Sequence, residues 1–207
     1  MATKKYETKR DFRKTPEPKG SGKRRRKSGG KPIFVVQEHD ASTHHYDFRL
    51  EVDGVLKSWA VPKGPSTDPK EKRLAVRTED HPLDYADFEG VIPDEEYGGG
   101  TVIVWDTGPY DNLTEDGEGG ELAPAKAVEQ GHFLVRLHGK KLSGGYALQR
   151  TGMGGKDEEN WLLVKMRDDD ADARRNPTST EPKSVKTGRT VKQVEQEEGE
   201  AEGGDDE

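Results

Sequence analysis

A sixteen-residue stretch, HDASTHHYDFRLEVDG at 39–54, holds three of the chain's six histidines together with three aspartates and an arginine. Side chains alternate between the faces of a strand, so His45, Asp47 and Arg49 would share one face. An imidazole nitrogen and a carboxylate oxygen two residues apart can share one cation, and this mixed set suits Mn, Fe or Zn. His39 ends the preceding strand and could fold back beside His45. Arg49 would then bind an anionic ligand such as phosphate.

The opposite face of the same strand would carry Tyr46, Phe48, Leu50 and Val52, which are apolar enough to line a core. His44 begins this row, and we interpret it as a strand-end residue rather than a ligand. For an average strand, the polar face would be an ordinary solvent-exposed surface. Spacing alone leaves that interpretation and the metal site both open.

A second dense stretch, RTEDHPLDYADFEG at 77–90, places His81 before Pro82, where the backbone is extended or in a turn. Tyr85 follows, next to Asp84. One interpretation is a surface loop with a proline turn. The other is a loop that brings a proton donor and a phenol to a substrate.

The elements that would position these residues are mostly strands, separated by turns rich in Gly, Pro and Asp. VDGV at 52–55 is typical of a hairpin turn, and ELAPAKAVEQG at 121–131 predicts a short helix ended by Gly131. Such a pattern of about eight short strands predicts an all-β fold, either a small β-barrel or a sandwich. The expected strands are 32–40, 44–52, 55–62, 73–80, 101–108, 132–139, 145–152 and 160–167.

Charge is segregated along the 207 residues, although the net charge is only −7. Residues 1–31 hold 13 basic and 3 acidic side chains, whereas residues 32–176 hold 17 basic and 29 acidic ones. Residues 195–207 hold 8 acidic side chains and no basic ones. Such runs favour flexible, charged arms around a folded centre.

We therefore expect four segments. Residues 1–18 form an N-terminal motif segment, 19–31 a basic flexible linker, 32–167 the β-barrel domain, and 168–207 a disordered, acidic C-terminal tail. The chain has no cysteine, which excludes disulfides and thiolate metal sites. No apolar run approaches the ~20 residues that span a bilayer, and no secretory signal is evident. We expect a cytoplasmic monomer without membrane contact.

The motifs HDAS..HYDFRLE, SWAVPKGPS and EDHPLDYADFEG, with YGGGTVIVWDTGPY and the N-terminal YETKRDFRKTPEP, are long and specific. Together they resemble the 3′-phosphoesterase domain of bacterial DNA ligase D and its free-standing bacterial and archaeal relatives. The resemblance runs from about Tyr6 to Met166, and we expect a stand-alone version of the domain. It implies a compact β-barrel with Mn²⁺-dependent 3′-end-healing activity. The enzyme would remove a 3′-terminal ribonucleoside by phosphodiester cleavage and then the 3′-phosphate, leaving a 3′-OH for repair and ligation.

Site residues carry over from the family where the motifs match. The resemblance implies a metal site formed by His39, His45 and Asp47. Essential residues around the scissile phosphate would be Arg49, His81 and Tyr85.

Further residues carry over with narrower roles. Lys63 and Arg73 resemble additional phosphate contacts. The residues that resemble those needed mainly for the phosphodiesterase step are Arg10, Asp11 and Glu17, with Gln37 and Glu79 as similar candidates.

The expected partner is DNA, as a primer-template or duplex with a 3′-ribonucleotide or 3′-phosphate end, and a separate DNA ligase or end-joining protein would follow. Because the centre of the chain is acidic, the basic linker would serve as a DNA-binding arm whose affinity depends on salt. No base-reading motif is visible, so recognition would be of the end and the backbone. The acidic tail could compete with DNA for that arm.

Two other functions fit parts of the sequence. A non-haem Fe(II) oxygenase would use His45 and Asp47 with a distal histidine, His132 or His138, and Arg150 for an oxoacid. It predicts that His138 is essential and His39 dispensable. A non-catalytic module that binds DNA ends is the second alternative, although it would not need the full set of site residues.

Overall fold

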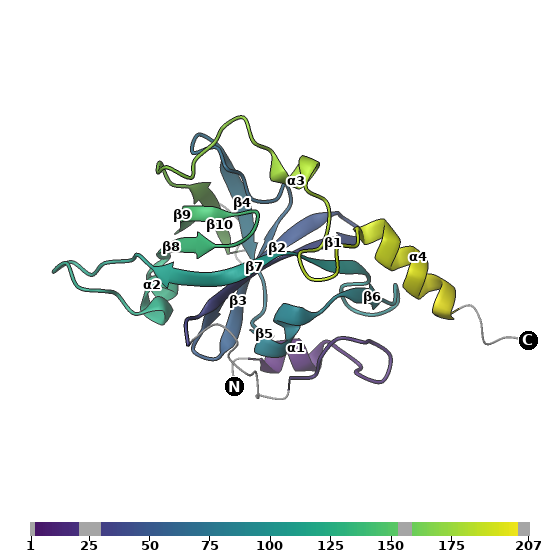
Figure 1. The fold of residues 1–207 in the computed structure, drawn as a ribbon. Coiled ribbons are helices and arrows are strands. Elements are labelled where there is room, and N and C mark those ends of the chain that lie inside the picture. Colours follow the sequence, from purple (N-terminus) through teal and green to yellow (C-terminus); the bar gives the residue numbers. More distant parts are fainter. Residues whose placement is uncertain (1–2, 21–29, 153–158, 203–207) are drawn as a thin grey trace, which may run out of the picture.

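Ten β-strands form one antiparallel sheet in the computed structural model, which describes residues 3–20, 30–152 and 159–202 (Figure 1). The mainly β fold expected from the sequence is confirmed. The strands are β1 Ile33–Ala41, β2 His45–Val52, β3 Val55–Val61, β4 Lys72–Arg77, β5 His81–Pro82, β6 Gly90–Ile92, β7 Gly100–Asn112, β8 His132–His138, β9 Ser143–Arg150 and β10 Asn160–Lys165.

Eight of these ten strands close into a ring, because β1 pairs with β2 on one side and with β7 on the other. The order around the ring is β1, β2, β3, β4, β10, β9, β8 and β7. β7 is 13 residues long, so it can pair with β6 at residues 100–102, with β1 along residues 100–109 and with β8 at residues 110–112. All eight strands expected from the sequence are present, whereas the short β5 and β6 were not predicted.

The hairpin between β2 and β3 turns at Asp53 and Gly54, as the VDGV pattern predicted. Both residues have positive φ, at 49° and 80°, which is the geometry of the turn that matches the twist of paired strands. The turn sets the register, so that Arg49 lies opposite Ser58. This pairing is important for the site described below.

Apolar side chains pack on both sides of the strands that carry the polar stretch. One cluster fills the ring, and a second lies between β1, β3 and β7 and the segments that cover them. The inner cluster includes Phe34, Phe48, Leu50, Trp59, Trp105, Phe133 and Trp161. The outer cluster includes Tyr6, Val35, Leu56, Tyr85, Phe88, Val102 and Val104.

The expected helix is α2, Pro124–Gln130, and it ends at Gly131 with φ 80°, a left-handed conformation that favours glycine. The other helical segments were not predicted. They are α1 Lys4–Thr8, the 3-10 helix η1 Leu83–Asp87, α3 Pro177–Thr180 and the longer α4 Val191–Glu202.

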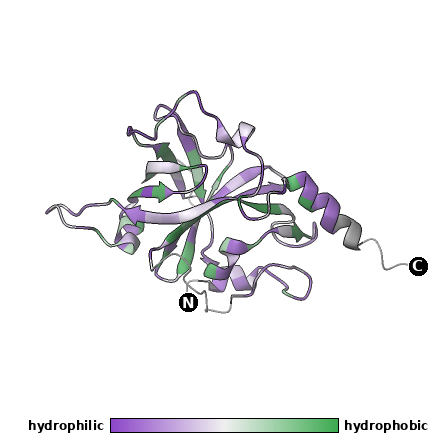
Figure 2. Cartoon of the chain, in the orientation of Figure 1, coloured by the Kyte–Doolittle hydropathy of each residue, from purple (hydrophilic) through white to green (hydrophobic). Residues whose placement is uncertain are grey.

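The expectation of a disordered tail from residue 168 is wrong for residues 168–198, which pack against the ring (Figure 1). Trp105 donates its indole N–H to the Glu181 carbonyl at 2.9 Å, and Lys141 donates to the same carbonyl at 2.7 Å. Val194 is fully buried beside Ile103. Most of these contacts use backbone polar groups, and Figure 2 shows α4 as mostly hydrophilic, so composition alone did not reveal them.

The N-terminal segment covers the outer cluster beside β5 (Figure 1). Tyr6 of α1 is fully buried and donates its hydroxyl to the Pro18 carbonyl at 2.7 Å. Most of the predicted basic linker, 21–29, lies outside the described residues. None of the helices in the described ranges has the length and apolar character needed to cross a lipid bilayer.

Candidate metal and phosphate site

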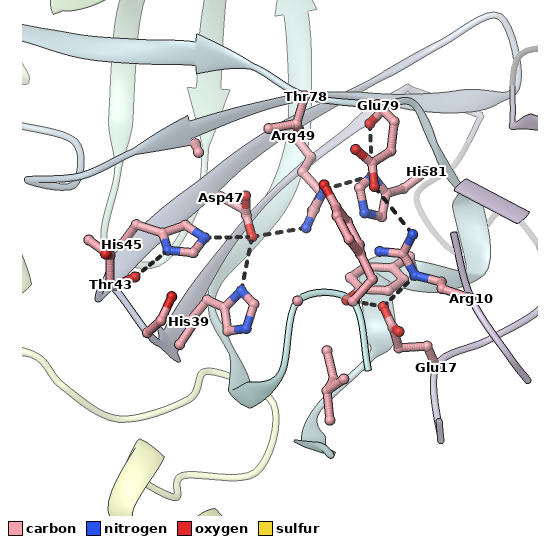
Figure 3. A pocket seen from close by; sticks show the side chains of 17 residues that line it. Arg10, Glu17, His39, Thr43, His45, Asp47, Arg49, Thr78, Glu79 and His81 are labelled. Atoms are coloured by element: carbon pink, nitrogen blue, oxygen red, sulfur yellow. Dashed lines mark hydrogen bonds and ion pairs between the residues drawn. The ribbon is translucent and has the colours of Figure 1, made fainter. Parts of the chain in front are cut away.

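His39 and His45 face each other across the β1–β2 hairpin, with Asp47 beside them (Figure 3). The centroids of the two imidazole rings are 4.8 Å apart. Oδ2 of Asp47 lies 3.6 Å from Nε2 of His45 and 3.8 Å from Nδ1 of His39. One donor atom from each residue lies within 4.8 Å of the others. The structure therefore brings together the three predicted ligands in an arrangement compatible with a metal ion.

The hydrogen bonds around these three residues also fit a metal ion. His45 donates Nδ1–H to the Thr43 carbonyl at 2.8 Å, which fixes the tautomer and leaves a lone pair on Nε2 toward Asp47. Nε2 of His39 is buried and has no hydrogen-bond partner among the described residues. The other nitrogen of this ring, Nδ1, lies nearest Asp47, so it is the one that could share a cation with that carboxylate. Two imidazoles and one carboxylate suit Mn, Fe or Zn better than Ca.

Arg49 continues the row next to Asp47, and its Nη2 lies 3.0 Å from Oδ2 of that carboxylate. Burial raises the pKa of Asp47, but Arg49 and the two imidazoles outweigh burial and hold the pKa well below its ordinary value. Asp47 is therefore ionised at neutral pH. An ionised carboxylate is the form that can bind a cation.

Neighbours on the two adjacent strands fix the Arg49 guanidinium, which is only 2% exposed. Its Nε donates to Gln37 on β1 at 2.8 Å, and its Nη1 donates to Ser58 on β3 at 2.9 Å. The amide of Gln37 in turn donates to the carbonyls of Tyr85 and Phe88. The polar face of β2 is thus buried and hydrogen-bonded rather than solvent-exposed, which decides between the two interpretations of this strand.

His81 lies beside Arg49 as a neutral imidazole. Burial lowers its pKa, and the nearby charges of Arg49 and Arg10 lower it further, well below the ordinary value. Its Nδ1 is 2.9 Å from Nη1 of Arg49 and 2.9 Å from the Glu79 carbonyl. Arg49 can only donate and the carbonyl can only accept, so the tautomer of His81 decides which contact is a hydrogen bond.

Tyr85 and the N-terminal segment close the other end of the row. The Tyr85 hydroxyl donates to Glu17 at 2.9 Å, and Nε of Arg10 lies 2.8 Å from the same carboxylate oxygen. Burial, together with the charge of Glu17, raises the pKa of Tyr85 well above its ordinary value, so the phenol keeps its proton. Arg10 also reaches Glu79 at 3.2 Å. Burial raises the pKa of Glu79, but a backbone hydrogen bond, Lys9 and Arg10 outweigh it, and the pKa is lowered.

Most of these groups line one cavity of about 330 Å³. Of the predicted site residues, Gln37 supports the cavity from behind through Arg49. Nine others line it directly: Arg10, Glu17, His39, His45, Asp47, Arg49, Glu79, His81 and Tyr85.

The remaining three predicted site residues lie elsewhere. Asp11 pairs with Arg13 at 2.8 Å in a local turn and does not line the cavity. Lys63 and Arg73 line a separate cavity of about 380 Å³ that includes Thr178. There Arg73 donates to the Lys63 carbonyl at 3.1 Å.

The oxygenase alternative does not fit this geometry. His138 is exposed and pairs with Asp111 at 2.6 Å on the far strand β8, and His132 is exposed on the same strand. Arg150 lies 3.6 Å from Glu159. None of these residues lines the cavity, so neither His132 nor His138 completes a facial triad with His45 and Asp47.

Sequence reasoning missed two residues of the site, one behind the cavity and one that lines it. Ser58 holds Arg49, and the register set by the VDGV turn could have revealed it, because that turn places positions 49 and 58 opposite each other. Tyr97 lines the cavity from the loop before β7. Only the tyrosine within the glycine-rich EEYGGG could have indicated it.

The side chains from the metal ligands through Arg49, His81 and Tyr85 to Arg10 form a row that can bind an anion next to a cation. Arg49 and Arg10 supply fixed positive charge, while a neutral imidazole and a protonated phenol supply hydrogen bonds between them. Charge-assisted contacts of this kind suit a phosphate group. The carboxylates of Glu17 and Glu79, at the Arg10 end, instead suit hydroxyl donors.

Comparisons with known proteins agree with this geometry. The family described as DNA Ligase D 3′-phosphoesterase domain matches residues 37–150. The multifunctional non-homologous end joining protein LigD of Pseudomonas aeruginosa is 52% identical over 188 residues, which cover 90% of this chain and 21% of that protein. The LigD proteins of Mycobacterium tuberculosis and Mycolicibacterium smegmatis are 46% and 45% identical over 164 and 163 residues, covering 78% and 79% of this chain.

These matches cover 19% of the Mycobacterium tuberculosis protein and 20% of the Mycolicibacterium smegmatis protein, so the chain spans about a fifth of the length of these relatives. The matched range includes the metal-site hairpin, Arg49, His81 and Tyr85. The cavity, its charges and the family match lead to one assignment. This chain belongs to the DNA ligase D 3′-phosphoesterase domain family.

Proposed function

We propose that this protein is a metal-dependent phosphoesterase that processes DNA 3′ ends for repair. It removes a 3′-terminal ribonucleoside by phosphodiester cleavage and then the remaining 3′-phosphate, leaving a 3′-OH for a separate ligase in end joining. The observation that carries this proposal is the continuous row of ligands, guanidinium, imidazole and phenol in one cavity. Family membership supports it.

The metal site would be held by His39, His45 and Asp47, and Mn²⁺ is the ion we propose. When bound, a divalent cation supplies Lewis-acid stabilisation of phosphoryl oxygens and lowers the pKa of bound water. Two neutral imidazoles and one carboxylate leave about one net positive charge at the site. That charge would attract a 3′-phosphate.

Arg49 would bind the phosphate and stabilise charge that develops on its oxygens in the transition state. The hydrogen bonds from Arg49 to Gln37 and Ser58 hold the guanidinium in place beforehand, so little reorganisation is needed. Loss of one contact to the phosphate typically lowers the rate by roughly 10²–10³-fold.

His81 would exchange a proton with the phosphate or the leaving oxygen. Burial and the positive charges of Arg49 and Arg10 lower its pKa and keep it neutral before substrate arrives. A phosphate dianion would offset those charges and raise the pKa of His81, which would allow it to gain and then donate a proton. Tyr85, which keeps its own proton, would orient the phosphate by a hydrogen bond.

The substrate would be bound through its end and backbone rather than through base sequence. The basic residues of 19–31 would supply the contacts to the DNA backbone, since the folded centre of the chain is acidic. Lys63 and Arg73 would contact phosphate outside the metal cavity. Arg10, Glu17 and Glu79 would serve mainly the phosphodiesterase step; Asp11 would act on that step through the turn it forms with Arg13.

A labelled primer-template with one 3′-terminal ribonucleotide tests the proposal. The wild type, His45→Ala and His138→Ala would each be incubated with Mn²⁺, Mg²⁺ or EDTA. We expect shortening to a 3′-phosphate and then to a 3′-OH end with Mn²⁺, near-complete loss in His45→Ala, and full activity in His138→Ala. The last variant is the matched control, because His138 is an exposed histidine outside the cavity.

Other results would contradict the proposal. DNA binding without product under any metal would favour a non-catalytic module that holds DNA ends. Activity that survives His45→Ala would show that the hairpin is not the metal site.

A further inference from the structure

Tyr97 is the one exposed side chain among the phenylalanines, tyrosines and tryptophans whose burial the structure describes, at 48%. The other tyrosines and all three tryptophans there are buried. A single exposed ring is ordinary on a protein surface and needs no special explanation. Tyr97, however, lines the metal and phosphate cavity.

The backbone that carries Tyr97 is fixed to the strand of the metal ligand His39. Two successive turns, Pro93 to Glu96 and Glu96 to Gly99, form the loop. Gly100 then pairs with Ala41 at the end of β1, with φ 134° and no room for a Cβ, which would lie 2.2 Å from the Asp40 carbonyl oxygen. The ring is therefore presented at a set distance from the metal ligands.

Cationic side chains lie against the ring. Lys9 donates to the Tyr97 hydroxyl at 2.9 Å, and its ammonium is 4.3 Å from the ring centroid. Lys9 also reaches Glu79 at 3.3 Å, and Arg10 lies 5.5 Å from the ring centroid. The ring thus has cationic neighbours, and much of its surface remains open.

Two kinds of group meet at this end of the cavity. Glu17 and Glu79 both pair with Arg10, which lies between them, and their carboxylates repel phosphate but accept hydrogen bonds from sugar hydroxyls. An aromatic face near them suits a nucleobase, because stacking on a ring is favourable for any base. A ribonucleoside carries both a base and hydroxyl donors.

We propose that Tyr97 is the stacking surface for the base of the 3′-terminal nucleoside that leaves in the phosphodiesterase step. This inference rests on the proposed function and adds the position of the leaving group. The base stacks on Tyr97, while its ribose hydroxyls lie toward Glu17 and Glu79. A substrate that ends in a 3′-phosphate has no such nucleoside, so it gains nothing from the ring.

The test compares three primers that share one upstream strand. They end in a ribonucleoside, in a ribose that lacks its base, or in a 3′-phosphate. Values of kcat and KM would be measured for wild type, Tyr97→Leu, Tyr97→Phe and Leu74→Ala. Leu74 is the matched control, since it is similarly exposed, at 44%, but does not line the cavity.

We expect Tyr97→Leu to raise KM for the ribonucleoside primer by roughly tenfold or more relative to its effect on the 3′-phosphate primer. Tyr97→Phe should behave as wild type. On the primer that ends in a ribose without a base, the KM of wild type should be no lower than that of Tyr97→Leu. Equal losses on all three primers would overturn the proposal, because they would place the effect on the metal site or on the upstream strand. No loss on any primer would overturn it as well.

A binding measurement separates this inference from the proposed function. A terminal 2-aminopurine ribonucleoside would be bound in EDTA, where no turnover occurs. Quenching of its fluorescence by wild type but not by Tyr97→Leu would support stacking even if no metal supports hydrolysis. Equal quenching by both proteins would contradict stacking.

Discussion

Arg49 is the residue on which most of the site depends, because it joins Asp47, Gln37, Ser58 and His81 in one buried network. Arg49→Lys keeps the charge but removes the planar group that donates in several directions at once. We expect turnover to fall roughly 10²–10³-fold. Steady-state kinetics on a 3′-phosphate primer would measure it.

The control for that substitution is an exposed arginine on β8. Arg136→Lys changes the same group in a position open to solvent, and it should leave turnover unchanged. If Arg49→Lys were as active as Arg136→Lys, the guanidinium would not contact the phosphate in the transition state.

His81 gives a prediction for stability against pH. Its folded-state pKa lies well below the ordinary value near 6.5. Between these two values the unfolded chain binds a proton that the folded chain does not, so stability falls as pH drops below about 6.5. The free energy of unfolding then falls by up to about 1.4 kcal/mol per pH unit.

Urea unfolding in EDTA at pH 7.5 and 5.5 would measure this effect. His81→Gln should reduce the loss of unfolding free energy between the two pH values, because glutamine does not titrate. Identical losses in wild type and variant would show that folding does not lower the pKa of His81.

Sequence reasoning was most successful where local pattern decides the structure. The alternation of 45–52 and the turn at 52–55 placed Asp47 and Arg49 on one face, and the short 39–45 connection brought the two histidines together. Local pattern could not show that this face is buried. The cover comes from residues 3–20 and 81–98, which are distant in sequence, and no periodicity within β2 reports them.

At the scale of elements, the segment after β10 shows where composition fails. Residues 168–198 have few large apolar side chains, yet they donate and accept many hydrogen bonds with the ring. Such contacts depend on partners elsewhere in the chain, such as Trp105 and Lys141. Short helices α1, α3 and η1 were missed for the same reason, since they are too short to be stable by themselves.

We expect α4 to contribute to stability through Val194, which is fully buried against Ile103. Val194→Asp places an unpaired charge there and should lower the free energy of unfolding by roughly 2 kcal/mol or more. The matched control is Gln196→Asp, which adds the same charge at an exposed position of α4. Urea denaturation would measure the free energy of unfolding of both variants. Equal stability would mean that α4 does not stay on the ring in solution.

At the scale of the whole molecule, charge is divided between a basic N-terminal part and an acidic remainder. If residues 23–27 contact DNA, each contact releases counterions and steepens the dependence of affinity on salt. Replacing these five basic residues by glutamine should lower the slope of log K against log[salt] by up to about 0.9 per lost contact. DNA binding over a range of KCl concentrations would measure it.

The acidic residues 195–207 provide the companion experiment. Deleting them should raise DNA affinity at low salt if they compete for the basic residues, and the increase should disappear at high salt. Unchanged affinity would show that the two charged parts act independently.

Closure of the ring also bears on how the protein behaves at high concentration. An open sheet presents unpaired backbone groups at its two edges, and these can pair with a second chain and start aggregation. Here β1 and β7 pair with each other, so the edges left among the described strands are the very short β5 and β6. The Val91 N–H of β6 is already bound by the Glu198 carboxylate of α4 at 3.1 Å. The molecule therefore offers little template for strand addition, and α4 protects part of what remains.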